Sequence, residues 1–440
     1  MRKSHVPLIA MLVSAAPLVL AAAPAHCAPG GHSAGVPRYA RQALPAHDGW
    51  ASQDGGTTGG AAADAAHVYT VTDRAELAAA LDGGSAVPKI IQVSGTVDGN
   101  ADAAGDPLSC DDYATGGYSL DAYLAAYDPA VWGRDEVPSG PLEDARAASA
   151  AKQALQVELK VGPNTTIVGV GHEPRLLGLD LQVANVDNVI VRNLTFEDAF
   201  DCFPQWDPTD TADGNWNSEY DNLVLTGATH VWVDHNTFTD GRRPDAGQPY
   251  YFGRIYQQHD GEMDVVKGAD HVTASWNAFL DHDKTLLFGN SDGAAATDAG
   301  KLRVTLHHNL FQDIGERAPR VRFGQVDAYN NHYDVTDAAT YVYSLGVGKE
   351  SQLVAQYNAF TLPADVTAAR TIAYWKGTAM TEDHNYVNGR AADLLGAFDA
   401  ANPATPIAQG SGWTPTARTR VDDPRAVPQI VDRGAGAGRL

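Results

Sequence analysis

Residues 229–241 read THVWVDHNTFTDG, where a short apolar alternation leads to an asparagine that lies two positions before a phenylalanine. The same pattern, or a close variant, recurs in NVIVRNLTFED, HVTASWNAFLDH, RVTLHHNLFQDI and QLVAQYNAFTL. The gaps between successive aromatic positions are 42, 41, 32, 22 and 27 residues, for Phe196, Phe238, Phe279, Phe311, Tyr333 and Phe360. A shortest spacing of 22 residues with variable insertions predicts an all-β parallel β-helix, with three short strands in each coil.

This repeat also predicts which side chains stack. Equivalent positions of successive coils lie about 4.8 Å apart. We therefore expect a ladder of hydrogen-bonded asparagine side chains at one turn and a stack of phenylalanines inside, formed by Asn236, Asn277, Asn309 and Asn358 and by Phe238, Phe279 and Phe311. The longer coils would project long loops on one side and form a binding groove. A β-sandwich has similar strand statistics but explains the recurrent asparagine–aromatic corner less well.

Two segments have helical patterns. Residues 73–83, DRAELAAALDG, combine an aspartate cap with strong helix formers and a closing glycine. We expect this short helix to cap the N-terminal end of the β-helix, because an open end exposes an apolar cross-section and unpaired strand edges. Residues 140–159, GPLEDARAASAAKQALQVEL, predict a second helix.

The N-terminus has the pattern of an export signal. Residues 1–25 begin with Arg2 and Lys3, continue with an apolar run and end in small residues, which predicts a secretory signal peptide. A membrane anchor would need a longer apolar run, of about 20 residues. Residues 26–46, rich in Pro, Gly and Ala, predict a flexible leader, and residues 47–440 a single catalytic domain. We expect a secreted, extracellular monomer with no membrane contact after signal removal.

The formal net charge of −23 argues against nucleic acid as a partner, because phosphate binding needs a basic face. The cysteines are Cys27, Cys110 and Cys202, too few for a disulfide scaffold, and no cysteine–histidine cluster suggests zinc. In an oxidising compartment Cys110 and Cys202 could pair, which would leave Cys27 unpaired near the new N-terminus.

Three aspartates suggest a site for a hard cation. Asp221 lies in GNWNSEYDN, and Asp260 and Asp264 lie in HDGEMDVVKG, without obvious cationic neighbours. Calcium prefers oxygen ligands and tolerates irregular geometry. Along a straight strand Asp260 and Asp264 would be about 13 Å apart, so one ion requires the chain to bend at Gly261. The alternative is that these residues only cap turns, as aspartates often do.

Cationic residues are concentrated in ERAPRVRFG, residues 316–324, which holds Arg317, Arg320 and Arg322. Lys284, in LDHDKTLLFGNSD, is a candidate for binding an anion together with them, although an isolated lysine usually lies on a solvated surface. The pair Asp234 and His235 could form an acid–base couple, but the apolar residues around it favour a buried structural hydrogen bond.

Taken together, these motifs resemble the polysaccharide lyase family 1 pectate lyases, especially the secreted Bacillus-type enzymes. The matching segments are FEDAFDCFPQWDPTDTADGNWNSEYDN, HVWVDHNTFTDG, HDGEMD, DHDKTLLFGNSD and ERAPRVRFG, in the order of the family. The resemblance extends from about Asp48 to the C-terminal GAGAGRL, and departs from the Bacillus type at Cys202 and Cys110. It implies a right-handed parallel β-helix and cleavage of (1→4)-α-D-galacturonan, the polygalacturonate backbone of pectin.

The resemblance also implies roles for single residues. Asp221, Asp260 and Asp264 match the calcium aspartates, and their presence favours unesterified substrate. Lys284 and Arg322 match substrate-binding residues. Asp210, in DPTD, matches a position for an accessory cation or substrate contact, or caps a turn.

Arg317 matches the base that removes the C5 proton in a β-elimination. Because a free guanidinium is always charged, we expect calcium, Lys284 and Arg322 to lower the pKa of Arg317 and predict an alkaline activity optimum. The alternative is that Arg317 only clamps a carboxylate. Arg320 is expected to make a structural ion pair.

Two other classes of protein would share this fold. A polygalacturonase would need paired carboxylates that activate water and would work without calcium. A non-catalytic adhesin or carbohydrate-binding protein would bind without turnover and would not explain three aspartates beside Lys284 and Arg317.

Overall fold

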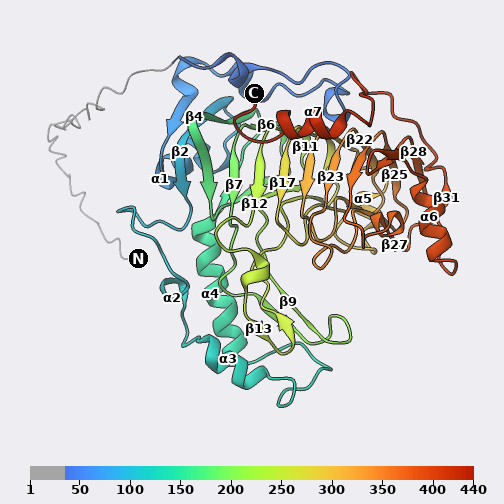
Figure 1. Ribbon diagram of the computed structural model, residues 1–440. Helices are drawn as coiled ribbons and strands as arrows, with labels where there is room; N and C mark the ends of the chain where they lie inside the picture. Colours follow the sequence, from blue (N-terminus) through green and yellow to red (C-terminus); the bar gives the residue numbers. More distant parts are fainter. Residues whose placement is uncertain (1–34) are drawn as a thin grey trace, which may run out of the picture. The chain divides into compact units, whose positions relative to one another are not determined.

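The computed structural model describes residues 35–440. Residues 37–440 form one compact unit, built on parallel strands wound into successive coils (Figure 1). The predicted signal peptide, residues 26–34 of the predicted leader and Cys27 lie outside the described residues.

Each coil contributes one strand to each of three parallel sheets. The first sheet consists of β3 (Glu158–Lys160), β5 (Asp180–Ala184), β10 (Leu223–Thr226), β15 (Met263–Val266), β18 (Leu287–Phe288), β21 (Arg320–Val321), β24 (Leu345–Gly348) and β27 (Ile372–Trp375). The second consists of β1 (Val68–Val71), β2 (Lys89–Asp98), β4 (Thr165–Leu177), β6 (Asp187–Arg192), β11 (Thr229–Asp234), β16 (Asp270–Ser275), β19 (Val304–His307), β22 (Gln325–Tyr329), β25 (Gln352–Gln356), β28 (Ala379–Asp383) and β31 (Ala408–Gln409). The third starts with the ends of β2 and β4 and continues with β7 (Thr195–Glu197), β12 (Thr237–Thr239), β17 (Ala278–Leu280), β20 (Leu310–Gln312), β23 (His332–Asp334), β26 (Ala359–Thr361) and β29 (Tyr386–Val387). This is the parallel β-helix predicted from the repeat.

The asparagine ladder is present and longer than predicted. The side-chain amide of Asn277 donates to Asn309 Oδ1 at 3.0 Å and to the main-chain oxygen of Val233 at 3.0 Å. The same two bonds repeat along six fully buried asparagines: Asn236, Asn277, Asn309, Asn331, Asn358 and Asn385. In the last member the amide donates to Glu382 instead of to a further asparagine. The ladder therefore saturates polar groups at a corner from which water is excluded.

The predicted aromatic stack lies next to the ladder. Phe238 and Phe279 have ring centroids 4.9 Å apart and nearly parallel planes, and the stack runs from Phe196 to Phe360. Both features have a coil-to-coil spacing close to that of neighbouring strands, so they reinforce the main-chain register.

The capping helix is confirmed as α1 (Arg74–Leu81). The carboxylate of Asp73 accepts the Glu76 main-chain N–H at 2.8 Å, which caps the first turn. Leu77 and Leu81 are buried among the apolar residues at the N-terminal end of the coils, so α1 closes that end as expected.

The long loops join the third sheet to the first in the coils before β10 and β15. They carry two hairpins, β8 (Gln205–Asp207) with β9 (Asn215–Asn217), and β13 (Tyr250–Tyr251) with β14 (Arg254–Ile255). The hairpins pack with α3 (Leu120–Tyr127) and the start of α4 (Pro141–Val157) around an aromatic core that includes Trp206 and Trp216. The short helix α2 (Cys110–Tyr113) packs beside it in a second cluster with Phe200 and Phe203. Figure 1 shows this lobe below the coils. The helix predicted over 140–159 is thus confirmed as α4.

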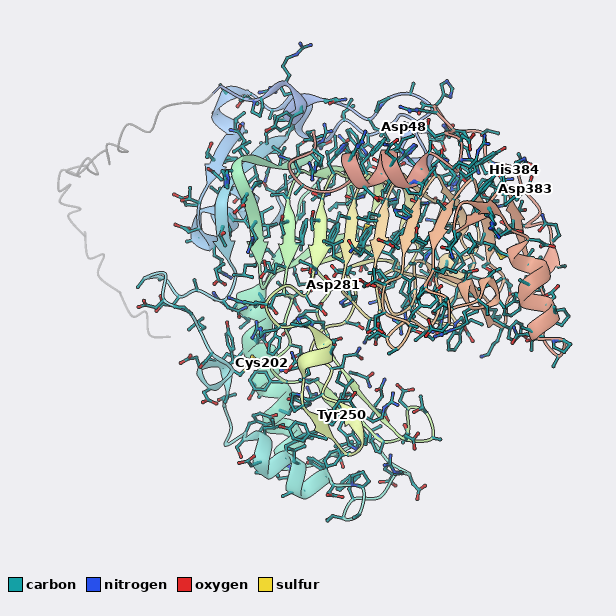
Figure 2. All side chains as sticks on the ribbon, in the orientation of Figure 1. Asp48, Cys202, Tyr250, Asp281, Asp383 and His384 are labelled. Carbon is teal, nitrogen blue, oxygen red and sulfur yellow. A yellow bond between two sulfur atoms is a disulfide. The ribbon has the colours of Figure 1, made fainter. Side chains whose placement is uncertain are left out.

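The sequence left open whether Cys110 and Cys202 pair, and the structure contains this disulfide, which ties α2 to the loop after β7 (Figure 2).

Part of the predicted flexible leader is instead packed. Leu44 is buried against Ile190 and Trp232 on the outer surface of the second sheet. Arg41 Nη1 donates to the main-chain oxygens of Ala61 and Ala63 at 2.9 and 2.8 Å. The prediction of flexibility was therefore wrong for residues 37–46, because composition did not reveal that an outer sheet surface was available to cover.

The remaining elements connect the strands or pack on the outside of the coils. They are α5 (Ala295–Asp298), α6 (Leu394–Ala401), α7 (Val427–Gly434), β30 (Arg390–Ala391) and the 3-10 turns η1 (Arg38–Arg41), η2 (Trp50–Ser52), η3 (Gly59–Ala62), η4 (Ala65–His67), η5 (Asp82–Gly84), η6 (Asp245–Gly247) and η7 (Ala368–Thr371). No helix within residues 35–440 combines the length and apolarity that crossing a membrane requires.

Replacing one rung of the ladder should destabilise the fold. In Asn309→Ala the main-chain and side-chain N–H groups of Asn277 lose their acceptor, which lies at 2.9 and 3.0 Å. We expect the free energy of unfolding, measured by urea denaturation, to fall by about 3 kcal/mol or more. The exposed Asn290→Ala should change it by no more than about 0.5 kcal/mol, and equal effects of the two would contradict the role of the ladder.

Candidate active site

Most of the predicted site residues lie in or next to first-sheet strands of neighbouring coils. Asp221 precedes β10, Asp260 precedes β15 and Asp264 lies within it. Lys284 precedes β18, and Arg317 and Arg322 flank β21, in which Arg320 pairs with Leu287 of β18. Residues far apart in sequence therefore lie on neighbouring coils.

The chain bends at Gly261, as the sequence analysis required. The Gly261 main-chain N–H donates to Asp221 Oδ1 at 2.7 Å. A Cβ at Gly261 would lie 2.6 Å from Asp221 Oδ1 and 2.8 Å from Asp264 Oδ1, so only glycine fits between the two carboxylates. The two carboxylates thus line a cradle that a larger residue would fill.

The electrostatics of this cradle favour a cation. Burial, followed by the charges of Asp264 and Asp260, raises the pKa of Asp221 well above its usual range. Burial and the Asp260 charge raise the pKa of Asp264 to about 7. Repulsion between buried carboxylates that lie close together disfavours their ionised forms. A bound cation offsets this repulsion.

Asp260 differs from the other two aspartates because it has a cationic partner. Lys284 Nζ lies 2.7 Å from Asp260 Oδ1, so the expectation that the triad lacks cationic neighbours was wrong for this residue. Burial would raise the pKa of Asp260, but Lys284 holds it below the usual range. The carboxylate oxygens of the three aspartates do not all lie within 4.8 Å of one another. Within residues 35–440 only two groups of three metal-ligating side chains meet that spacing, and neither is the triad.

Arg317 lies in the turn before β21 with a left-handed backbone, φ 62°. Its Nε donates to Glu316 Oε1 at 2.9 Å. Burial would lower the pKa of Arg317, but Glu316, Asp260 and Asp264 raise it above the ordinary value. Without a bound cation the expected lowering is therefore absent, because the nearest charges are carboxylates.

The other two arginines of the cluster differ in their partners. Arg322 is buried, with Nε 2.8 Å from Asp292 Oδ1 and Nη1 2.6 Å from the main-chain oxygen of Gly289. Arg320 has no carboxylate partner within residues 35–440, and its guanidinium carbon lies 3.8 Å from the ring centroid of Trp375. The expected ion pair of Arg320 was therefore wrong, because the nearby carboxylates are already paired with other cations.

Two further candidates lie apart from these contacts. Asp210 is exposed in the turn between β8 and β9, where its main-chain N–H faces the Asp207 oxygen at 3.4 Å, which fits a turn position. Asp234 is buried on the second sheet, pairs with Arg192 and accepts from Ser275 Oγ at 2.8 Å. These contacts favour the structural interpretation of Asp234 and His235.

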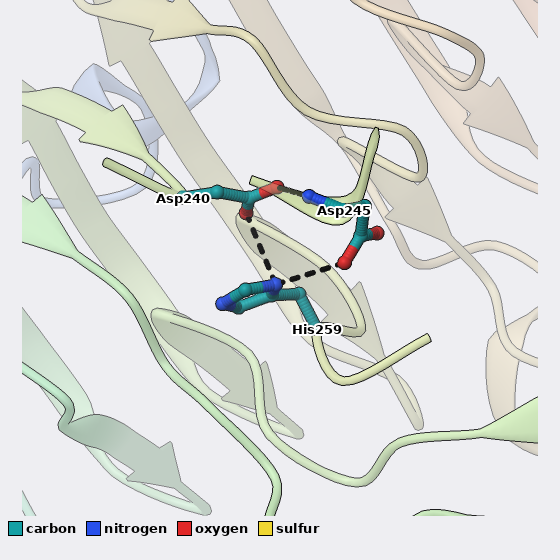
Figure 3. A group of neighbouring side chains, drawn as sticks. All are labelled: Asp240, Asp245 and His259. Atoms are coloured by element: carbon teal, nitrogen blue, oxygen red, sulfur yellow. Dashed lines mark hydrogen bonds and ion pairs between the residues drawn. The ribbon is translucent and has the colours of Figure 1, made fainter. Parts of the chain in front are cut away.

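A buried histidine–carboxylate network behind the triad was not found by sequence reasoning. His259 Nε2 lies 3.1 Å from Asp198 Oδ1. On the other side of the ring, Nδ1 lies 2.9 Å from Asp245 Oδ1 and 3.7 Å from Asp240 Oδ1 (Figure 3). Since every partner is a carboxylate, both ring nitrogens must carry protons. Burial would lower the pKa of His259, but Asp240, Asp198 and Asp245 raise it to about 9.

His282 connects this network to the triad. Its Nδ1 lies 2.7 Å from Asp240 Oδ1, and its Nε2 lies 2.8 Å from the main-chain oxygen of Asp260. Glu262, buried beside it, accepts from the side-chain amide of Asn222. The metal-ligating groups with the closest spacing, Asp240–Asp245–His259 and Asp240–Glu262–His282, both belong to this network. Their histidines flank the predicted residues in HDGEMD and LDHDK, a signal that the sequence does contain.

The comparisons with known proteins agree with these observations. The pectate lyase family model matches residues 32–121 and 140–408. This chain belongs to the pectate lyase family. It is 44% identical to a pectate lyase of Bacillus subtilis over 98% of this chain and 99% of that one. It is 40% identical to pectate lyase E of Dickeya dadantii, over 80% and 78% of the two chains.

Solved structures of the family have the same fold. A structure described as a pectate lyase bound to hexasaccharide has a TM-score of 0.87 at 43% identity and covers 92% of this chain and 100% of its own. A structure described by the substrate specificity and anti β-elimination mechanism of pectate lyase has a TM-score of 0.86 at 44% identity, over 91% of this chain and 99% of its own. The right-handed parallel β-helix and the enzyme class predicted from the sequence are therefore confirmed.

Protonated His259 should make the cation-free protein less stable at alkaline pH. Its pKa of about 9 in the folded state exceeds the unfolded value of about 6.5, so its contribution is complete below pH 6.5 and lost as pH rises through 9. We expect the free energy of unfolding in calcium-free buffer to fall over this range, and less steeply in His259→Gln. The exposed His172→Gln serves as the control, and equal slopes in the wild type and His259→Gln would contradict the assignment.

Proposed function

We propose that this pectate lyase is a secreted enzyme that cleaves (1→4)-α-D-galacturonan by calcium-assisted β-elimination and leaves a 4,5-unsaturated end on one product. The observation that carries the proposal is the meeting of two opposite sets of charges on neighbouring coils. Asp221, Asp260 and Asp264 form a carboxylate set, and Lys284, Arg317 and Arg322 form the cationic set. A polyanion with a carboxylate on every sugar can bind to both sets. The carboxylate set would bind it through a bridging metal cation, and the cationic set would bind it directly.

The carboxylate set suits calcium by its chemistry. All three donors are hard oxygens, and calcium accepts irregular oxygen geometry. The cradle at Gly261 and the raised pKa of Asp264 both favour a divalent cation, and Asp221, Asp260 and Asp264 would hold it. When bound, calcium neutralises the sugar carboxylate and stabilises charge that develops on it. Asp210, exposed in its hairpin turn, is proposed only as an accessory cation or substrate contact.

The cationic set orients the substrate. The fork of a guanidinium and the ammonium of a lysine both bind carboxylates, so Lys284 and Arg322 hold the sugar acids at the cleavage point. Their partners Asp260 and Asp292 keep the two cations in place before substrate arrives. The sugar is thereby oriented with its C5 proton toward Arg317.

Arg317, in its neutral guanidine form, takes the C5 proton on a side-chain nitrogen and becomes guanidinium. The C5–H electron pair forms the C4=C5 double bond, and the bond between C4 and the glycosidic oxygen breaks. The departing oxygen acquires a proton from solvent, and Arg317 returns its own to water. The charges of Asp260 and Asp264 contribute to the raised pKa of Arg317, so neutralising them makes the base easier to deprotonate.

The remaining parts of the proposal concern the whole protein. Export after cleavage near residue 25, with residues 47–440 as the catalytic domain, fits the Cys110–Cys202 disulfide, because such bonds persist in oxidising compartments. We propose that the enzyme acts as a monomer on pectin outside the cell, without nucleic acid or membrane partners.

The lyase reaction should depend on the aspartate triad. With polygalacturonate, we expect ultraviolet absorbance from the unsaturated product, abolished by EDTA and restored by calcium. Asp264→Asn should raise the calcium concentration needed by tenfold or more, while the exposed Asp365→Asn should not. New reducing ends without ultraviolet absorbance, insensitive to EDTA, would indicate a hydrolase, and binding without products would indicate a non-catalytic protein.

Arg317→Lys separates a base from a clamp. As the base, Arg317 should be irreplaceable, so turnover should fall by about 100-fold or more while KM stays near that of the wild type. As a clamp, it should tolerate lysine with appreciable turnover. Activity of the wild type should rise toward alkaline pH, and a sharp optimum below about pH 6 would count against Arg317 as the base, because too little neutral guanidine would exist.

A further inference from the structure

Arg320 is the member of the arginine cluster without an anionic partner. Arg317 pairs with Glu316 and Arg322 with Asp292, at 2.9 and 2.8 Å. Within residues 35–440 the Arg320 guanidinium has no carboxylate partner, and its buried Nε donates no hydrogen bond. A cation that is partly desolvated and unpaired is costly to the fold. The stability of the fold therefore does not explain why an arginine occupies this position.

The surroundings of Arg320 are aromatic. Its guanidinium carbon lies 3.8 Å from the ring centroid of Trp375, on β27, two coils further along the first sheet. The intervening strand β24 carries Gly346, where a Cβ would lie 3.1 Å from Arg320 Cβ and 2.9 Å from the Tyr343 ring. Glycine at this position allows the arginine to lie across β24 toward the tryptophan.

Aromatic surface continues past Arg320 and remains accessible. Tyr374 and Trp375 are 40% and 38% exposed. They line a hollow of about 550 Å³ together with Tyr343 and Arg370. Flat rings provide apolar area for the C–H face of a sugar, and a guanidinium provides a fork for its carboxylate.

We propose that Arg320 and Trp375 form a subsite for a uronate residue of galacturonan beyond the point of cleavage. Arg320 binds the carboxylate, and Trp375 packs against the ring of the same or the adjoining sugar. The inference rests on the proposed function, since it extends the same substrate along the first sheet. It is favoured by the direction of the sheet: Arg317 precedes β21, Arg320 begins it, and Trp375 ends β27, so a chain that runs along the coils from Lys284 and Arg317 passes this point next.

The alternative is a purely structural contact of guanidinium and indole. The two interpretations predict different effects of a substitution on the cleavage of short and long substrates. A distal subsite acts only on chains long enough to reach it, whereas a structural contact affects cleavage of every chain equally, through stability.

The experiment compares kcat/KM for galacturonate oligomers of increasing length, up to polygalacturonate, in the wild type, Arg320→Gln and Trp375→Ala. We expect each variant to lose about tenfold in kcat/KM on polygalacturonate, mainly through KM, and to match the wild type on the shortest oligomer that is cleaved. Arg303→Gln is the control for loss of a stacked arginine, because Arg303 precedes β19 of the second sheet, stacks on Trp50 and pairs with Asp270, and its loss should show no dependence on chain length.

Thermal unfolding of all variants shows whether each one is folded and how stable it is. If Arg320→Gln does not fold, Trp375→Phe and Trp375→Ala carry the comparison, since phenylalanine should retain more of the long-chain activity than alanine. Equal losses at every length, or no loss on polygalacturonate, would overturn the subsite. Failure of the proposed function is distinct, because the wild type itself would then release no unsaturated product from any length.

Discussion

Hydrogen bonding between successive coils is the interaction on which the rest of the structure depends. One coil alone buries little surface and leaves its strand edges unpaired, so each coil is stable only against its neighbours. The asparagine ladder extends the same pairing into side chains, and it occupies the corner where the chain turns from the second sheet to the third. The residue before each rung adopts a left-handed backbone, as in His235, Trp276 and His308. The corner is thus specified both by its backbone and by its hydrogen bonds.

The regular corner leaves the opposite side of each coil free to vary. The turns from the third sheet to the first contain the insertions, and the acidic triad lies where the two long ones end. Behind the triad, His259 and His282 neutralise carboxylates that burial would otherwise make unstable. His282 also contacts the main-chain oxygen of Asp260, the residue before Gly261. The buried network therefore helps to hold the bend of the chain at Gly261. Rigid coils therefore provide the frame, and buried charge pairs set the detailed geometry of the site.

The sequence predicted most of what repeats. The asparagine–aromatic pattern identified four of the six rungs of the ladder and three members of the aromatic stack, which extends from Phe196 to Phe360. The cap of α1 followed from Asp73. Asn385 was not predicted as a rung, because Val387 occupies the position of the aromatic residue. The packed part of the predicted leader was missed for a different reason, because the surface that buries Leu44 is created by residues more than a hundred positions away.

Periodicity along the chain was enough to predict the fold, because each coil repeats a local pattern that needs only its neighbour. The family and the residues that gather at the site were indicated by the resemblance of separate motifs to the pectate lyases. The partners of the charged residues were settled by folding alone. Asp260 meets Lys284, Arg322 meets Asp292, and Arg320 meets Trp375 instead of a carboxylate. Electrostatic energy depends on distance in space, and that distance follows from the lengths of the insertions and the stacking of the coils, neither of which a local motif contains.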